Sequence, residues 1–446
     1  MIPATQCYGW CSGRRPFGSA ATCRRFGTRR QVVEFAKADL PNITNHIGMH
    51  RSPVILAKHW TPPRRAVMLP GMTGTEKLLA ELIALPSVNP AFLPLRHPHA
   101  GEKKVADFLA SIAARAGLDI EYQKVLPGRA NFLARLRPAG PVRQTILLAP
   151  HLDTVVADST QFIPQRKNGR LYGRGACDTK GSVAAMLTAL IELANSPRRP
   201  QATEIVFAGL VDEENAQEGS RALVAGGFKA DLAIVGEPTR LAVVTAHKGS
   251  LWLELSTRGR AAHGATPSLG RNAVHAMARI VDCLETEYAA QLARRKHPLL
   301  GTATVNVGKI SGGTQPNIVP DHCVISVDRR LLPGETPAGV RREIAALLRA
   351  KGWPVQVATA KLAPAVALET DPARPLVHQF LVSLGQRKTV GVNYFCDAAV
   401  LSAGGIPSVV FGPGNIAQAH TADEWISLAE LERGKNLLLR FFRTLP

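Results

Sequence analysis

The sequence lacks long apolar runs, repeats and clustered cysteines. Within its 446 residues, no stretch approaches the roughly 18 apolar residues of a membrane span, so we expect no membrane partner. The seven cysteines are scattered without paired metal spacing, which favours reduced thiols and a cytoplasmic protein over a disulfide framework. What is present, 46% hydrophobic and 20% charged residues, indicates a globular protein with room for two or three domains.

The net charge of +20 lacks the distribution typical of a nucleic-acid-binding surface. Residues 1–71 contain eleven Lys or Arg and two Asp or Glu, so about +9 of the charge lies in the first sixth of the chain. The other 375 residues carry about +11, without a long basic run or a basic patch interleaved with aromatics. We therefore expect no nucleic-acid partner.

Residues 1–71 show no sustained helical or strand periodicity and no apolar core of a secretory signal. A transit peptide, a disordered tail and an upstream extension from a wrong start codon all fit this basic segment. Met72 stands directly before an amphipathic pattern at 75–83, and this favours the extension.

From residue 72 onward, apolar strand patterns alternate with helical ones. The sequence predicts strands near 119–125, 131–136, 144–149, 203–211 and 232–235, with helices near 102–116, 182–194 and 218–225. This alternation predicts an α/β fold, a mainly parallel sheet covered by helices on both faces.

The pattern changes after residue 245. Strands near 250–257, 302–309 and 322–330 and helices near 271–289 and 337–351 predict a small α+β module, ferredoxin-like in its order of elements. The first pattern returns with a helix near 373–385, a strand at 407–411 and a helix at 428–443. The predicted organisation is an extension at 1–71, a catalytic domain at 72–245 and 363–446, and an inserted lid or dimerisation domain at 246–362.

Five potential metal ligands stand near predicted strand ends or in the loops that follow them: His151, Asp178, Glu214, Glu237 and His420. Ligands bind beyond the carboxyl ends of the strands in open α/β sheets. Alone, His151-Leu152-Asp153 would be more typical of a polar loop. Its occurrence together with four other potential ligands favours a metal site. Two histidines and three carboxylates suit a pair of divalent ions such as zinc, with one carboxylate bridging them.

These residues lie in motifs with a recognisable order and spacing. The motifs are His151-Leu152-Asp153, the run from Gly173 to Gly181, Asp212-Glu213-Glu214, Gly236-Glu237-Pro238-Thr239 and the run from Ala419 to Glu424. Over about residues 72–446 the sequence resembles the di-zinc amidohydrolases that include acetylornithine deacetylase, succinyl-diaminopimelate desuccinylase, carboxypeptidase G and aminoacylase. The resemblance implies a hydrolase fold with the inserted lid.

The resemblance also implies a role for each motif residue. His151 and Glu237 would hold one ion, Glu214 and His420 the other, and Asp178 would bridge them, with a cis peptide bond between Asp178 and Thr179. The ions would be zinc, with cobalt as an alternative. Asp153 would orient His151.

The implied reaction is hydrolysis of an amide by water that the metals activate. Glu213 would be the general base and would pass its proton to the leaving amine. His263, from the inserted domain, would stabilise the oxyanion, in many relatives across a homodimer. Asn317 and Arg330 would bind the substrate carboxylate, although a structural role for Asn317 in its turn is equally compatible. The other histidines, including His247, are interpreted as packing or surface residues.

The stretch from Gly412 to His420 looks most like that of acetylornithine deacetylase, which implies amino-acid metabolism (arginine biosynthesis) and a small N-acyl amino acid as substrate, acetylornithine first. Desuccinylase, aminoacylase and dipeptidase or carboxypeptidase activities remain alternatives. The inserted segment disfavours a di-zinc aminopeptidase without a lid. A binding protein built on an inactive hydrolase fold is a further alternative, disfavoured because no predicted ligand or base is missing.

Overall fold

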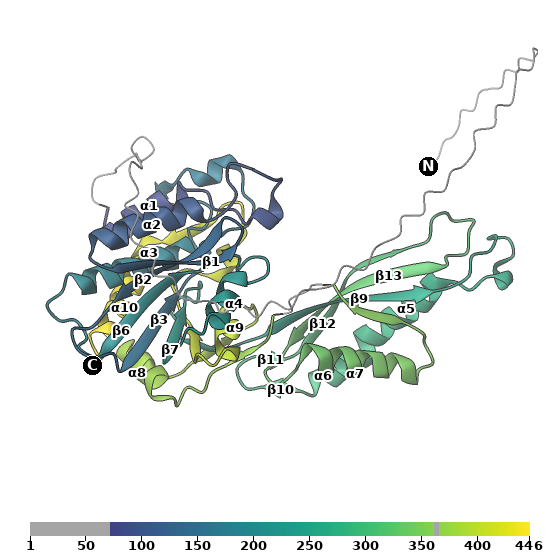
Figure 1. Ribbon diagram of the computed structural model, residues 1–446. Coiled ribbons are helices and arrows are strands. Elements are labelled where there is room, and N and C mark those ends of the chain that lie inside the picture. Colours follow the sequence, from purple (N-terminus) through teal and green to yellow (C-terminus); the bar gives the residue numbers. More distant parts are fainter. Residues whose placement is uncertain (1–71, 361–364) are drawn as a thin grey trace, which may run out of the picture. The chain divides into compact units, whose positions relative to one another are not determined.

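The computed structural model of the chain describes residues 72–360 and 365–446, so the predicted extension at 1–71 lies outside the described residues. The larger sheet has the strand order β1-β2-β6-β3-β7-β17-β8-β15, and β16 pairs with β8 (Figure 1). Its strands are β1 (Asp119–Leu126), β2 (Arg129–Leu136), β3 (Gln144–Ala149), β6 (Thr203–Gly209), β7 (Leu232–Val235), β8 (Val244–His247), β15 (Leu368–Glu369), β16 (Val390–Val392) and β17 (Ser408–Val410). The central four, β6-β3-β7-β17, are parallel to one another.

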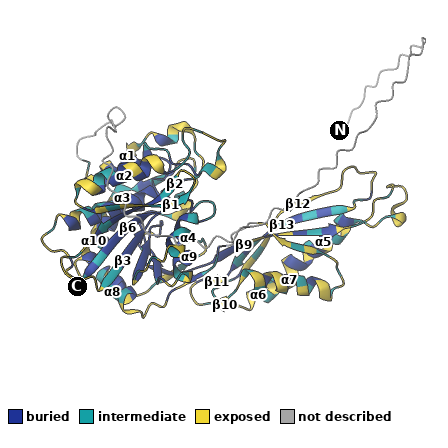
Figure 2. Ribbon diagram, viewed as in Figure 1, coloured by how far each residue is buried: buried dark blue, intermediate teal, exposed yellow. Residues whose placement is uncertain are grey.

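Helices cover both faces of this sheet because successive strand side chains point to opposite sides. On β3, Ile146 and Leu148 belong to the core cluster with α1 (Gly74–Ile83), α2 (Lys103–Arg115), α3 (Lys180–Ala194), α8 (Pro375–Ser383) and α10 (Leu428–Phe442). Leu147 and Ala149 belong to the opposite cluster, with α4 (Glu218–Ala225) and α9 (Ala398–Ala403). Figure 2 shows the strands buried between these helices. The predicted α/β class is confirmed.

The inserted segment forms its own four-stranded antiparallel sheet, in the order β12-β13-β9-β14. The strands are β9 (Gly249–Arg258), β12 (Thr304–Gly312), β13 (His322–Leu331) and β14 (Gln356–Thr359). When the four strands are numbered in chain order and the sheet is read from β14, the order is 4-1-3-2, which ferredoxin-like modules share. On β9 and β13 buried and more exposed positions alternate, so one face packs on α5 (Ala273–Cys283) and α7 (Pro337–Ala350).

Some elements differ from the sequence-based expectation. The predicted helix at 271–289 is α5, followed by a π-helical turn at Leu284–Tyr288 and by α6 (Ala289–Ala293). Two small sheets form from strands too short to show a sequence pattern. In one, β10 (Lys296–His297) pairs with β11 (Gly301–Thr302); in the other, β5 (Arg170–Tyr172) lies between β18 (Trp425–Ser427) and β4 (Gln165–Lys167). Among the described residues, no helix combines the length and apolarity needed to cross a membrane.

His247 ends β8, directly before the chain enters the inserted sheet at Gly249. Its side chain is fully buried, and its Nδ1 lies 2.9 Å from the carbonyl oxygen of Lys248. Burial lowers the pKa of His247 from 6.5 to about 4. The ring is therefore packed in its neutral form, in keeping with the interpretation of His247 as a packing residue.

We expect His247 to make the folded protein acid-sensitive. The unfolded chain binds the proton near pH 6.5 and the folded chain only near pH 4, so stability is lost as the pH falls through this window. The loss in unfolding free energy approaches about 3 kcal/mol. Urea unfolding of wild type and His247→Gln between pH 7 and pH 4 should give a shallower pH dependence for the variant. An unchanged dependence would contradict this assignment.

Candidate active site

Four of the five predicted ligands follow strands whose carboxyl ends lie at one edge of the larger sheet, and the fifth, Asp178, precedes a helix. His151 comes two residues after β3, Glu214 follows β6 and Glu237 follows β7. His420 lies in the loop after β17, and Asp178 immediately precedes the N-cap residue of α3. Because β6, β3, β7 and β17 are adjacent and parallel, their carboxyl ends bring these side chains together.

Asp178 lies between the two histidines. Its Oδ1 is 3.1 Å from Nε2 of His151, and its Oδ2 is 3.3 Å from Nε2 of His420. Glu237 is on the His151 side, with Oε1 3.8 Å from that Nε2. Glu214 is on the His420 side, with Oε2 3.2 Å from its Nε2. Ligand atoms of His151, Asp178 and Glu214 lie within 4.8 Å of one another. Each carboxylate oxygen of Asp178 thus faces a different histidine.

The donor atoms fit a cation between them. Nδ1 of His151 is 3.0 Å from the carbonyl oxygen of Asp153, a group that can only accept a hydrogen bond. The proton of a neutral ring is therefore on Nδ1, and the Nε2 lone pair points at the oxygens of Asp178 and Glu237. Two acceptors in this geometry repel unless a proton or a metal ion lies between them.

The carboxylates also carry more negative charge than buried groups tolerate alone. Burial raises the pKa of Glu213 and of Glu237 well above the usual range, and the charges of neighbouring acids raise both further. The pKa of Glu214 is raised by burial and by the charge of Asp178. Asp397, a buried residue that we did not single out in the sequence, adds to the charge near Glu213 and Glu237. Divalent cations would compensate this charge.

Asp153 supports the site from behind His151. Its Oδ1 is 3.5 Å from Nδ1 of His151 and accepts a hydrogen bond from the backbone N–H of Glu213 at 3.1 Å. Its Oδ2 accepts from the N–H of Glu214 at 3.1 Å and from Nδ2 of Asn89 at 2.7 Å. Hydrogen bonds to His151 and Asn89 outweigh burial and lower the pKa of Asp153. Asp153 therefore touches both the ring and the turn that presents the two glutamates.

The loop that carries Asp178 is held by Glu424. This buried carboxylate accepts hydrogen bonds from the backbone N–H groups of Gly175, Cys177 and Asp178 at 2.8–2.9 Å and pairs with Arg174 at 2.7 Å. The Asp178–Thr179 peptide bond is cis, as the resemblance implies. Glu424 belongs to the motif at 419–424, but the sequence assigns it no role, because it contacts Asp178 across 246 positions of the chain.

The inserted segment carries the other three predicted residues, and the structure separates Arg330 from the neighbouring His263 and Asn317. The N–H of Gly264, next to His263, donates to the carbonyl oxygen of Asn317 at 2.7 Å. The side chains of His263 and Asn317 are both exposed. Arg330 is half-buried near the opposite end of β13. The eight steps from His322 to Arg330 span about 26 Å at about 3.3 Å per residue. Within one chain, His263 and Arg330 are not brought together.

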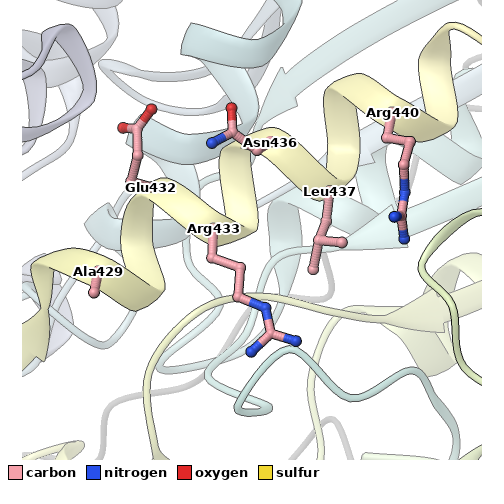
Figure 3. A pocket seen from close by; sticks show the side chains of 6 residues that line it. All are labelled: Ala429, Glu432, Arg433, Asn436, Leu437 and Arg440. Carbon is pink, nitrogen blue, oxygen red and sulfur yellow. The ribbon is translucent and has the colours of Figure 1, made fainter.

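Cys177 does not offer a second chemistry. Its Sγ lies 3.3 Å from the carbonyl oxygen of Asn415, and burial raises the thiol pKa far above its usual range. A shallow hollow of about 470 Å³ on the outer side of α10 is also unrelated to the ligands (Figure 3). Its lining comes from that helix alone: Ala429, Glu432, Arg433, Asn436, Leu437 and Arg440.

Comparison with known proteins shows the family of the chain. The sequence profile of peptidase family M20/M25/M40 matches residues 147–444. The chain belongs to this family and is a metal-dependent amidohydrolase. It is 31% identical to the acetylornithine deacetylase of Myxococcus xanthus over 389 residues, covering 83% of this chain and 97% of the relative. It is 32% identical to that of Proteus mirabilis over 377 residues, covering 81% and 94%.

Solved structures share the fold at lower identity. Aminopeptidase PepT from Bacillus cereus superposes with a TM-score of 0.69 at 22% identity, covering 83% of this chain and 97% of its own. A dinuclear metal-binding peptidase of the M20 family from Bacillus subtilis gives 0.62 at 13% identity, covering 83% and 97%. The predicted family is confirmed.

Proposed function

We propose that this protein is a two-metal deacylase that releases the amine of a small N-acyl amino acid, with acetylornithine as its preferred substrate. The observation that carries the two-metal part is the position of Asp178, whose two oxygens face His151 and His420. The substrate class is supported by the acetylornithine deacetylases to which the chain is 31–32% identical.

The geometry suggests how the ligands divide. His151 and Glu237 would hold one ion, Glu214 and His420 the second, and Asp178 would be shared. Imidazole nitrogens and carboxylate oxygens suit zinc, and cobalt can replace it in such a donor set. When bound, the ions would lower the pKa of a water molecule and polarise the amide carbonyl.

Glu213 is proposed as the proton carrier. Its backbone N–H is fixed by Asp153, and its buried carboxylate lies in the field of His151 and Glu237. It would take one proton from the attacking water while the new C–O bond forms. It would return that proton to the amide nitrogen as the C–N bond breaks. The products are a free amine and a carboxylic acid, and the acid loses its proton to solvent to become the carboxylate.

His263 is proposed as the donor to the oxyanion. Its Nδ1 accepts a hydrogen bond from the N–H of Ala265 at 3.1 Å, so a neutral ring carries its proton on Nε2 and can donate it. His263 bridges to Ile318, just before the start of β13, whereas Arg330 lies near the end of that strand, so one substrate would not contact both from a single chain. This separation supports a homodimer in which the inserted domain supplies His263 to the partner's site.

Arg330 is proposed to bind the substrate carboxylate. Its guanidinium is 3.0 Å from Asp328 and 6.0 Å from the ring centroid of Phe395. Lys248 is close enough that, after burial, the charge of Arg330 lowers its pKa. Two cations at one place favour an anionic group. Asn317, on the exposed loop beside His263, would contact the same substrate from the partner's side.

A substrate panel tests the proposal. The purified chain, loaded with zinc or cobalt, is assayed for amine release from acetylornithine, succinyl-diaminopimelate, other acetyl amino acids and dipeptides. We expect the highest kcat/KM for acetylornithine, and preference for another member would reassign the substrate within the same chemistry. Absence of turnover on the whole panel, with salt-dependent nucleic-acid binding, would reject the hydrolase and favour an inactive binding protein.

A further inference from the structure

Asn89 is a fully buried amide behind the metal ligands, on a loop that is fastened to the loop after His151. Its own N–H donates to the carbonyl oxygen of Thr154 at 2.9 Å, and the N–H of Thr154 donates back to Ser87 at 3.0 Å. The side-chain Oδ1 accepts from the N–H of Ala91 at 3.0 Å, which fixes the orientation of the amide. Its Nδ2 group therefore points away from Ala91, toward two carboxylates.

These carboxylates belong to Asp153 and Asp212. Nδ2 of Asn89 lies 2.7 Å from Oδ2 of Asp153 and 3.0 Å from Oδ1 of Asp212. An amide nitrogen has two hydrogens, so both bonds can form at once. The two carboxylates repel each other because both are negatively charged, and the two hydrogen bonds from the amide offset this repulsion. Asn89 thus holds two buried acids side by side.

Arg129 closes the far side of this cluster. Its Nη1 is 2.9 Å from Oδ1 of Asp212, and the rest of its guanidinium pairs with both oxygens of Glu102. Glu102 in turn accepts from the backbone N–H of Asp212 at 3.2 Å. Asp212 has a φ of 69°, in the left-handed region, immediately before the two glutamates of the site. The contacts of Arg129 and Glu102 hold this residue from both its side chain and its backbone.

We propose that Asn89 is a positioning residue of the metal centre and that Arg129 supports it. Asn89 clamps Asp153, which contacts the His151 ring and the N–H groups of Glu213 and Glu214. Arg129 clamps Asp212, which starts the turn carrying those glutamates. The inference rests on the two-metal site proposed above. Partners of this kind, one contact behind a metal ligand, set ligand orientation and affinity.

The role of Asn89 depends on its being an amide. Asn89→Ala removes both hydrogen bonds and leaves Oδ2 of Asp153 with the Glu214 N–H, so the carboxylate can rotate relative to His151. Asn89→Asp keeps the shape but places a third acid between two others. We expect either change to weaken zinc binding about 10–100-fold. Arg129→Lys keeps the charge but loses the fork, so it should weaken binding in the same direction.

The chain offers a matched control. Arg135, on the same strand as Arg129, also pairs with two glutamates. Arg135→Lys therefore reproduces the loss of an arginine fork without touching Asp153 or the turn at Asp212. Asn131 is unsuitable for this purpose, because its Oδ1 accepts from the N–H of Val211, the residue before Asp212, at 3.2 Å.

The experiment measures zinc affinity by chelator competition, the visible absorption spectrum of the cobalt(II) form and thermal unfolding of the metal-free protein. The Asn89 and Arg129 variants should show weaker zinc binding and an altered cobalt spectrum. The Arg135→Lys control should lose only thermal stability. If Asn89→Ala fails to fold, Arg129→Lys provides the same readouts.

Wild-type affinity and spectrum in Asn89→Ala, or in Arg129→Lys where that variant takes its place, would overturn the inference. An equal loss in Arg135→Lys would also overturn it, because the effect would then be general destabilisation. Failure of the wild-type protein to bind zinc or cobalt would instead reject the metal centre itself, and this inference with it.

Discussion

Replacing Glu213 by Gln is expected to lower kcat about 10²–10⁴-fold, the usual contribution of a positioned general base. Gln has the same shape but cannot accept the proton of the attacking water or return it to the amine. Because Glu213 is proposed as base rather than ligand, the variant should keep both metals. The measurements are kcat for amine release and the ratio of zinc to protein after gel filtration.

Glu218→Gln is the matched control for this change. Glu218 is half-buried at the start of α4, four residues after Glu214, and should keep its activity when neutralised. Loss of zinc from Glu213→Gln would contradict the proposed role and make Glu213 a ligand. Full activity in Glu213→Gln would place the base elsewhere.

Asp178→Ala should affect metal binding more than any other single ligand change. Asp178 faces both histidines, so its loss removes an oxygen from each proposed ion. Residues that only support a ligand contribute up to about 100-fold to metal affinity, so loss of a shared ligand should weaken binding of both metals by at least about 100-fold. Chelator competition with stepwise zinc addition measures the two affinities separately.

Glu237→Ala provides the comparison for Asp178, because Glu237 lies near only one of the two histidines, His151. This change should weaken the binding of one ion strongly and the binding of the other little. If Asp178→Ala gave the same one-sided pattern, Asp178 would not be shared.

Much of the fold follows from local sequence patterns. The long apolar strands, such as β3 and β6, and the amphipathic helices α2 and α10 have many residues in register with one period, so their positions were predicted closely. The positions of the short elements cannot be predicted in this way. The two residues of β15 and the three of β16 form strands because they pair with β8, and no local pattern encodes that pairing.

The predicted ligands could be found because each stands after an apolar strand or in a motif of fixed spacing. Asn89, Arg129 and Glu424 could not, because their contacts join residues far apart in the chain. Asn89 and Asp212, for example, are 123 positions apart, and nothing in the sequence around either specifies the other. Arg129 lies beside Asp212 and offsets part of the charge of the consecutive acids at 212–214.

The five proposed ligands differ in their access to water. The side chain of His151 is 2% exposed, whereas that of His420 is 53% exposed. An ion held by Glu214 and His420 would therefore exchange with solution faster than one held by His151 and Glu237. The two positions could then be filled in sequence, the enclosed one first, and an enzyme with two different metals could be prepared by exchanging only the outer ion. Such a hybrid would report the contribution of each position to catalysis separately.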